Sequence, residues 1–154
     1  MTSYVHLCQH GAMTTTGEPD YAALLAFRTA LRRFHRWSEQ QAEAAGLTAA
    51  QHQLLLAVKG HEGRRGPTIG EIAEYLLLRH HSTVELVNRA QAAGLVTRTK
   101  DDTDGRVVRV QLTGTGEQAI ERLTQLHLDE LHQLEPLLRH LVASEAFDGA
   151  LPLS

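Results

Sequence analysis

The chain is poor in the residues that mark several classes of protein. Among 154 residues there is one cysteine, Cys8, which excludes an internal disulfide framework and agrees with a reducing compartment. Aromatic residues make up 5% of the chain and hydrophobic residues 42%, which is typical of a helical protein with a core of Leu and Ala. No stretch is long and apolar enough to span a membrane, and no signal peptide precedes the first predicted helix. We therefore expect a cytoplasmic protein.

Sequence patterns of catalysis are missing as well. The chain contains no G-x-S-x-G, no Gly-rich phosphate loop, no metal-ligand pair at helical spacing and no cluster of carboxylates on one predicted face. Hydrolysis, group transfer and redox chemistry therefore lack a candidate site. We expect neither an enzyme nor a bound cofactor.

Ten histidines suggest a metal site, but their spacing argues against one. Three groups of potential ligands occur: the neighbours His80 and His81, the pair His127 and His132, and the run His6, Cys8 and His10. Neighbours cannot both face one way on a helix, and residues five apart are separated by about 140°. The run would place its ligands on one side of a strand, but residues 1–18 lack periodicity and are predicted to be a flexible tail. We predict no metal site, and a metal- or redox-sensing regulator remains a minor alternative.

Charge is distributed unevenly along the chain. Residues 110–154 hold seven acidic and two basic residues, a net charge of −5, so the total of −3 leaves +2 for residues 1–109. An acidic C-terminal region beside a more basic head suits a protein whose head attracts phosphate. The basic side chains that would supply this attraction are Arg79, Arg89, Arg98, Lys100, Arg106 and Arg109.

Helical patterns cover the first two thirds of the chain. A long helix is predicted from Pro19 to Ala45, ended by Gly46, and Thr48 with Gln51 forms a capping box for a second helix through Lys59. After a polar loop, a second capping box, Thr68 with Glu71, opens a helix that continues to Leu76.

The next helix has one face to bury and one to expose. Thr83, Leu86, Val87 and Ala90 recur at helical spacing, and Gly94 stands where a left-handed cap is wanted. A start at Ser82 would also make a capping box, but a start near His80 fits the buried face better.

A charged β-hairpin follows these helices. Residues 95–100 and 106–112 are rich in Val and Thr, and residues 101–105 have turn chemistry. Arg106, just past the turn, is placed to reach a phosphate or a narrow minor groove, and Asp104 to hold that guanidinium through a charge-assisted bond.

Beyond Thr113 the chain is helical again and strongly apolar on one side. Pro136 is expected to divide this region and leave a short final helix to about Val142. The apolar residues exceed what one thin helix pair can cover, which favours a partner chain over a monomer; they are Ile120, Leu123, Leu126, Leu131, Leu134, Leu138 and Leu141.

Four motifs in order, G-L-T-A-A-Q-H-Q-L-L-L-A, T-I-G-E-I-A-E-Y-L, V-N-R-A-Q-A-A-G-L-V-T-R and D-G-R-V-V-R-V-Q-L-T, resemble the MarR family of bacterial transcriptional regulators over residues 21–141. The resemblance implies a mainly α fold with a small β-hairpin wing (α+β), as one domain over residues 19–154. Residues 48–113 would form a winged helix-turn-helix, and residues 19–45 and 114–147 the dimerisation helices. One departure is L-L-R-H-H at residues 77–81, where many relatives place a Gly and a Ser before the recognition helix.

The resemblance also implies a function: a homodimer, more often a repressor, that binds a palindromic operator in double-stranded DNA. Helix 80–93 would enter the major groove and wing 95–112 the minor groove. The side chains predicted to contact DNA are His80, His81, Ser82, Val84, Asn88, Arg89, Arg98, Lys100, Asp104 and Arg106.

Members of the family commonly bind small aromatic or phenolic effectors between the dimerisation helices and the DNA-reading domain. The residues that would line such a cleft here are Phe34, His35, Trp37, His52 and Leu56; the alternative is that Phe34, Trp37 and Leu56 are core residues. A winged-helix module that binds another protein instead of DNA remains the main alternative, because a fold does not dictate its use.

Overall fold

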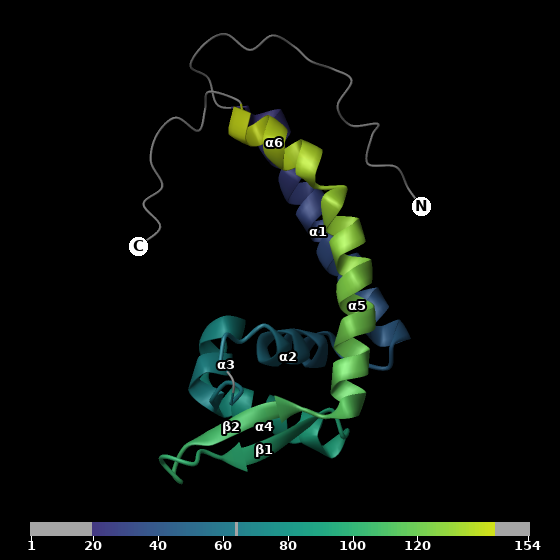
Figure 1. Ribbon diagram of the computed structural model, residues 1–154. Helices are drawn as coiled ribbons and strands as arrows, with labels where there is room; N and C mark the ends of the chain where they lie inside the picture. Colours follow the sequence, from purple (N-terminus) through teal and green to yellow (C-terminus); the bar gives the residue numbers. More distant parts are fainter. Residues whose placement is uncertain (1–19, 64, 144–154) are drawn as a thin grey trace. The chain divides into compact units, whose positions relative to one another are not determined.

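The computed structural model describes residues 20–63 and 65–143, which divide into two compact units (Figure 1). The predicted tail, with His6, Cys8 and His10, lies outside the described residues. The elements in chain order are α1 (Tyr21–Ala44), α2 (Ala49–Lys59), α3 (Ile69–Leu76), α4 (His80–Ala92), β1 (Val96–Lys100), β2 (Val108–Leu112), α5 (Gly114–His132) and α6 (Glu135–Ala143). The mainly helical class with one β-hairpin is confirmed.

Residues 38–125 form the larger unit, and both predicted capping boxes are present in it. The Thr48 hydroxyl accepts from the Gln51 amide while the Gln51 side chain accepts from the Thr48 amide, and Thr68 and Glu71 repeat this exchange. Each box satisfies two N–H groups that a helix start leaves unpaired. The starts of α2 and α3 are thus determined locally by sequence.

Helix α4 begins at His80, as the buried face requires, and Arg79 precedes it without a side-chain cap. Thr83, Leu86, Val87 and Ala90 are all buried. The Thr83 hydroxyl donates to the Arg79 carbonyl at 3.2 Å, which satisfies the one polar group on this face. The predicted burial pattern of α4 is confirmed.

Strands β1 and β2 pair antiparallel, with Val96 opposite Leu112 and Lys100 opposite Val108. The second strand begins at Val108 and not at Arg106 as predicted. The turn reaches further because the Asp104 side chain accepts from the Arg106 amide at 3.0 Å and the Asp104 carbonyl from the Val107 amide at 2.9 Å. In Figure 1 the hairpin projects as a wing, with its turn away from the start of α5.

The core of this unit joins all its elements. Its fully buried large side chains include Leu54 and Leu55 of α2, Ile72 of α3, Val87 of α4, Val96 and Val110 of the hairpin and Ile120 of α5. Because these residues lie in one cluster, the helices and the base of the wing form one packed body.

Three helices end in the same backbone arrangement, in which two amides bond back to the final turn and one residue has positive φ. That residue is Gly46 after α1 (φ 78°), Leu77 after α3 (φ 54°) and Gly94 after α4 (φ 70°). At the end of α3, the Leu77 amide donates to the Glu74 carbonyl at 3.2 Å and the Leu78 amide to the Ala73 carbonyl at 2.9 Å. This is the Schellman motif, which normally carries Gly at the left-handed position. Leu77 is therefore held in a backbone conformation that a side chain disfavours.

Residues 20–37 and 126–143 form the described part of the smaller unit. The Asp20 carboxylate accepts from the Ala23 amide at 2.8 Å and caps α1. Pro136 lies in the first turn of α6, where a missing amide costs nothing, so the predicted division of the C-terminal helix is confirmed. Across the described residues of both units, every helix is too short or too polar to serve as a membrane span.

Candidate nucleic-acid interface

The exposed side of α4 carries most of the residues predicted from the sequence. His80, His81, Asn88 and Arg89 are exposed, whereas Ser82 and Val84 are half-buried. These side chains come from a helix whose opposite face is fixed in the core. A rigid helix with polar and cationic groups outward is suited to contact an extended anionic surface.

The N-terminus of α4 favours negative charge. Its first turn contains no acidic residue, and Arg79, His80 and His81 are exposed there. Unpaired amides and the helix dipole add positive potential at the same end. Anionic groups are thus attracted to the start of this helix.

The wing adds exposed and half-buried cations. Lys100 and Arg106 are exposed, and half-buried Arg98 donates to the Val84 carbonyl of α4 at 3.3 Å. The structure therefore brings Arg98 to the predicted reading helix. Asp104 contacts the Arg106 backbone amide, and within residues 20–63 and 65–143 it forms no ion pair with the Arg106 guanidinium. The expected bond between these side chains is replaced by a backbone bond that shapes the turn.

Asp101, which begins the turn of the wing directly after β1, was not predicted from the sequence as a site residue. Its side chain is only 3% exposed and pairs with two arginines, Arg109 of β2 and Arg65 of the loop before α3. It also accepts from the hydroxyl and amide of Thr103 and from the amide of Asp104. The Thr103 hydroxyl first, and then the Arg109 guanidinium, hold the pKa of the Asp101 carboxyl well below its ordinary range.

Arg109 has a different place from the one predicted. It was expected to attract phosphate, but its side chain is 19% exposed, and it pairs with Asp101 and donates to the Gly66 carbonyl at 2.9 Å. Thr68 forms a bridge with Arg109, and the Val110 amide donates to the Pro67 carbonyl at 2.9 Å. The segment before α3 thus pairs briefly with β2, on the side of that strand that does not face β1. The G-P step at residues 66 and 67 was the only local signal of this contact.

The predicted effector residues fall in both compact units. In the smaller unit, the Trp37 and Phe34 rings lie 5.0 Å and 5.9 Å from the ring of His127, and His35 contacts Phe34 at 6.0 Å between centroids. In the larger unit, two predicted residues lie on α2, where His52 is buried and Leu56 exposed. The structure therefore brings together Phe34, His35 and Trp37.

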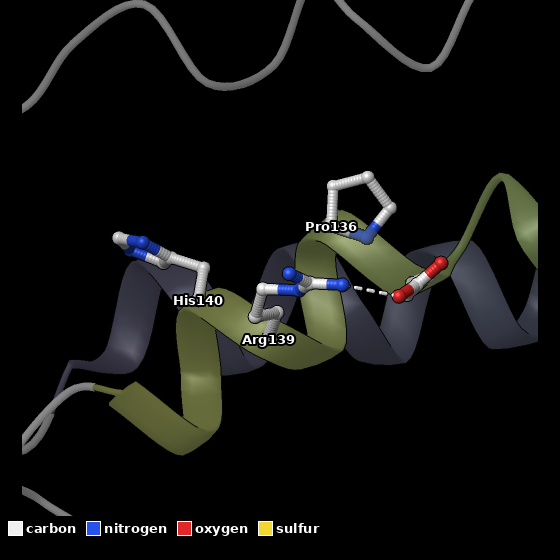
Figure 2. A pocket seen from close by; sticks show the side chains of 4 residues that line it. Pro136, Arg139 and His140 are labelled. Atoms are coloured by element: carbon white, nitrogen blue, oxygen red, sulfur yellow. Dashed lines mark hydrogen bonds and ion pairs between the residues drawn. The ribbon is translucent and has the colours of Figure 1, made fainter.

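A depression of about 530 Å³ lies on α6 and contains none of the predicted effector residues (Figure 2). It is lined by Glu135, Pro136, Arg139 and His140. Figure 2 shows the Arg139 guanidinium turned to the Glu135 carboxylate one helical turn away. Among the residues that the structure describes, no group of three His, Cys, Asp or Glu side chains is arranged to hold a metal ion.

Comparison with known proteins agrees with this architecture. The model of the MarR family matches residues 45–107. The transcriptional activatory protein BadR of Rhodopseudomonas palustris is 30% identical over 91 residues, 59% of this chain and 52% of that protein. The uncharacterized HTH-type regulator YsmB of Bacillus subtilis is 41% identical over 56 residues, 36% of this chain and 38% of that protein. The chain matches about half or less of the length of these relatives.

Solved structures match over more of the chain. MepR, a transcription regulator of the Staphylococcus aureus multidrug efflux pump MepA, superposes with a TM-score of 0.63 at 24% identity, over 81% of this chain and 87% of that one. A mutant of Escherichia coli MarR, in complex with operator DNA, gives a TM-score of 0.61 at 24% identity, over 81% of this chain and 86% of that one. These likenesses establish a winged helix-turn-helix fold. The family match to residues 45–107 shows that this segment of the chain is similar to the MarR family.

Proposed function

We propose that the protein is a transcriptional regulator that binds double-stranded DNA. The observation that carries the proposal is the common surface of α4 and the wing: an exposed polar helix face joined through Arg98 to a hairpin with exposed Lys100 and Arg106. The match of residues 45–107 to the model of the MarR family supports the proposal, since that family is one of transcriptional regulators. DNA binding in turn implies a cytoplasmic location.

In this proposal α4 enters the major groove and the wing the adjacent minor groove. Asn88 is suited to pair with a base edge, and Arg89, His80 and His81 to contact phosphate or guanine. The exposed Arg106 is suited to a narrow minor groove, where negative potential is highest.

Fluorescence anisotropy with tiled fragments of the upstream intergenic DNA tests the proposal. We expect tight binding to one tile that weakens steeply with salt, because each neutralised phosphate releases counterions. In Arg106→Ala the slope of log affinity against log salt falls by about one unit and the affinity drops. Weak binding that is equal on every tile, or an unchanged affinity of Arg106→Ala, contradicts this account.

Arg122→Ala supplies a matched control. Arg122 is an exposed arginine of the same compact unit, on α5 within the acidic C-terminal region. Its removal deletes one positive charge without touching α4 or the wing. We therefore expect its affinity and salt slope to equal those of the wild type.

We further propose that the regulator is a homodimer. The smaller unit exposes large apolar side chains that a second copy of the chain could cover. They are Tyr21, Leu24, Leu25, Leu126, Leu128, Leu131 and Leu138. Two reading heads related by a two-fold axis match a palindromic operator with half-sites about 34 Å apart. Sedimentation equilibrium should give twice the chain mass of 17.0 kDa, and a mass equal to one chain would refute the dimer.

A small aromatic effector is proposed to act on this dimer. The support is the half-buried pair Phe34 and Trp37, whose rings lie 6.0 Å apart. Trp37 is the one tryptophan of the chain, so its fluorescence reports binding without labels. Saturable quenching by phenolic acids that is lost in Phe34→Ala is the expected result; quenching without saturation argues against a site.

Repression through occupancy of a promoter is the proposed mode. The relative BadR is named an activatory protein, so activation is the competing outcome. A reporter fused to the bound tile separates them, since deletion of the regulator raises expression under repression and lowers it under activation. A protein partner in place of DNA would instead leave every tile unbound.

A further inference from the structure

A surplus positive charge lies where the turn of the wing begins. The buried carboxylate of Asp101 faces two guanidinium groups, with Arg65 Nη1 3.1 Å from Oδ1 and Arg109 Nε paired to Oδ2. One negative charge against two positive charges leaves this cluster with a net charge of +1. Within the described ranges, Asp101 is the only carboxylate that pairs with Arg65.

The two arginines are used differently. Arg109 is 19% exposed and also donates to the Gly66 carbonyl, so its guanidinium is committed inside the protein. Arg65 is 51% exposed and contacts Asp101 through one nitrogen. Asp101 is already compensated by Arg109 and by bonds from Thr103. The carboxylate therefore does not depend on Arg65 for its charge balance.

The backbone beneath Arg65 is held against β2. Gly66 has φ 76°, and a Cβ there would lie 2.2 Å from the Val110 carbonyl oxygen, so only Gly permits this approach. The Gln111 side chain donates to the Arg65 carbonyl at 3.5 Å. Because the loop is held against the strand and the guanidinium is bonded to Asp101, the Arg65 side chain is already partly ordered in the free protein. DNA binding would therefore cost this side chain less conformational entropy.

The single positive charge of Arg65 is as large as the net charge of the whole wing. Residues 96–112 carry four basic and three acidic residues, a net charge of +1, and Arg65 raises the total at this surface to +2. An exposed, positioned guanidinium fits a phosphate oxygen, which it can bind through paired N–H donors.

We propose that Arg65 is a further phosphate-binding residue of the DNA interface, held beside the turn of the wing by Asp101. This inference rests on the proposed DNA-binding function. It adds a contact from the loop before α3 to those of α4 and the wing tip.

The test is the salt dependence of binding to a duplex of random sequence and to the bound tile. In Arg65→Ala the slope of log affinity against log salt falls by about 0.9, equally on both duplexes, because a phosphate contact carries no sequence information. Arg65→Lys retains the charge and recovers most of the slope. Arg122→Ala, which removes an arginine elsewhere in the same unit, leaves it unchanged.

The outcomes separate the two proposals. If Arg65→Ala lowers thermal stability but leaves the slope unchanged while Arg106→Ala reduces it, then Arg65 only supports Asp101 and this inference is overturned, with DNA binding intact. If the wild type shows no salt-dependent binding to either duplex, the proposed function fails and this inference with it.

Discussion

Replacing Leu77 by Gly should stabilise the protein. Leu77 occupies the left-handed position of a Schellman motif at φ 54°, where the same chain places Gly46 and Gly94 after two other helices. Its side chain is 92% exposed, so its removal sacrifices almost no buried apolar surface. The variant therefore tests backbone strain nearly in isolation.

The magnitude follows from two opposing effects. Left-handed backbone costs an L-residue about 1–2 kcal/mol, and Gly loses about 0.5–1 kcal/mol more conformational entropy on folding than other residues. The net expectation for Leu77→Gly is a gain of about 0.5–1 kcal/mol in the free energy of unfolding. For a chain of this length that corresponds to a rise of roughly 1–4 °C in Tm.

Urea unfolding followed by circular dichroism measures the change, at a protein concentration held constant. Gly94→Ala is the matched control, because it places a side chain at the same left-handed position of another helix end. Its Cβ would meet nothing within 4 Å, so any loss of stability reports the backbone strain alone. We expect it to lose about 1 kcal/mol. A Leu77→Gly variant no more stable than the wild type would refute the strain at this position.

Three further predictions concern packing, pH and assembly. Gly116→Ala should lower the free energy of unfolding by about 1–3 kcal/mol, because its Cβ would lie 2.1 Å from the Leu95 carbonyl oxygen. Gly114→Ala is the control and should leave the stability unchanged, because a Cβ there meets no atom within 4 Å. Equal stabilities of the two variants would contradict the close approach at Gly116. Because folding lowers the pKa of Asp101, its contribution to stability is present above its unfolded pKa of about 4 and is lost as the pH falls below that value. Urea unfolding at several pH values should therefore show that the free energy of unfolding falls less steeply with acid in Asp101→Asn than in the wild type. Parallel curves for the two proteins would exclude this role. Leu131→Glu should halve the mass seen by sedimentation, and an unchanged mass would remove this exposed leucine from the dimer contact.

The parts of the fold that sequence predicts well depend on local chemistry. Both capping boxes involve residues three apart, and the buried face of α4 follows from helical spacing, so neither needs knowledge of the rest of the chain. The start of β2 was wrong by two residues. There, a side-chain bond from Asp104 to the Arg106 amide extends the turn, and such competition between turn and strand is not visible in an alternating pattern.

The exposure of the candidate site residues was predictable from the sequence, whereas the buried ion pairs beside them were not. Exposed Asn88, Arg89 and Arg106 follow from their places on a helix face and past a turn. Asp101 resembled one more turn residue, because one of its two arginine partners, Arg65, is 36 positions away in the sequence. For the same reason Arg109 resembled a free cation until pairing across the sheet committed it to Asp101.

The most direct test of the account is a footprint of the protein on its bound DNA tile. Guanine methylation reports the major groove, and hydroxyl radicals report the minor groove. The account predicts two protected major-groove segments about one helical turn apart, flanked by minor-groove protection that disappears in Arg106→Ala. The absence of a protected segment on every tile, or flanking protection that persists in Arg106→Ala, would contradict it.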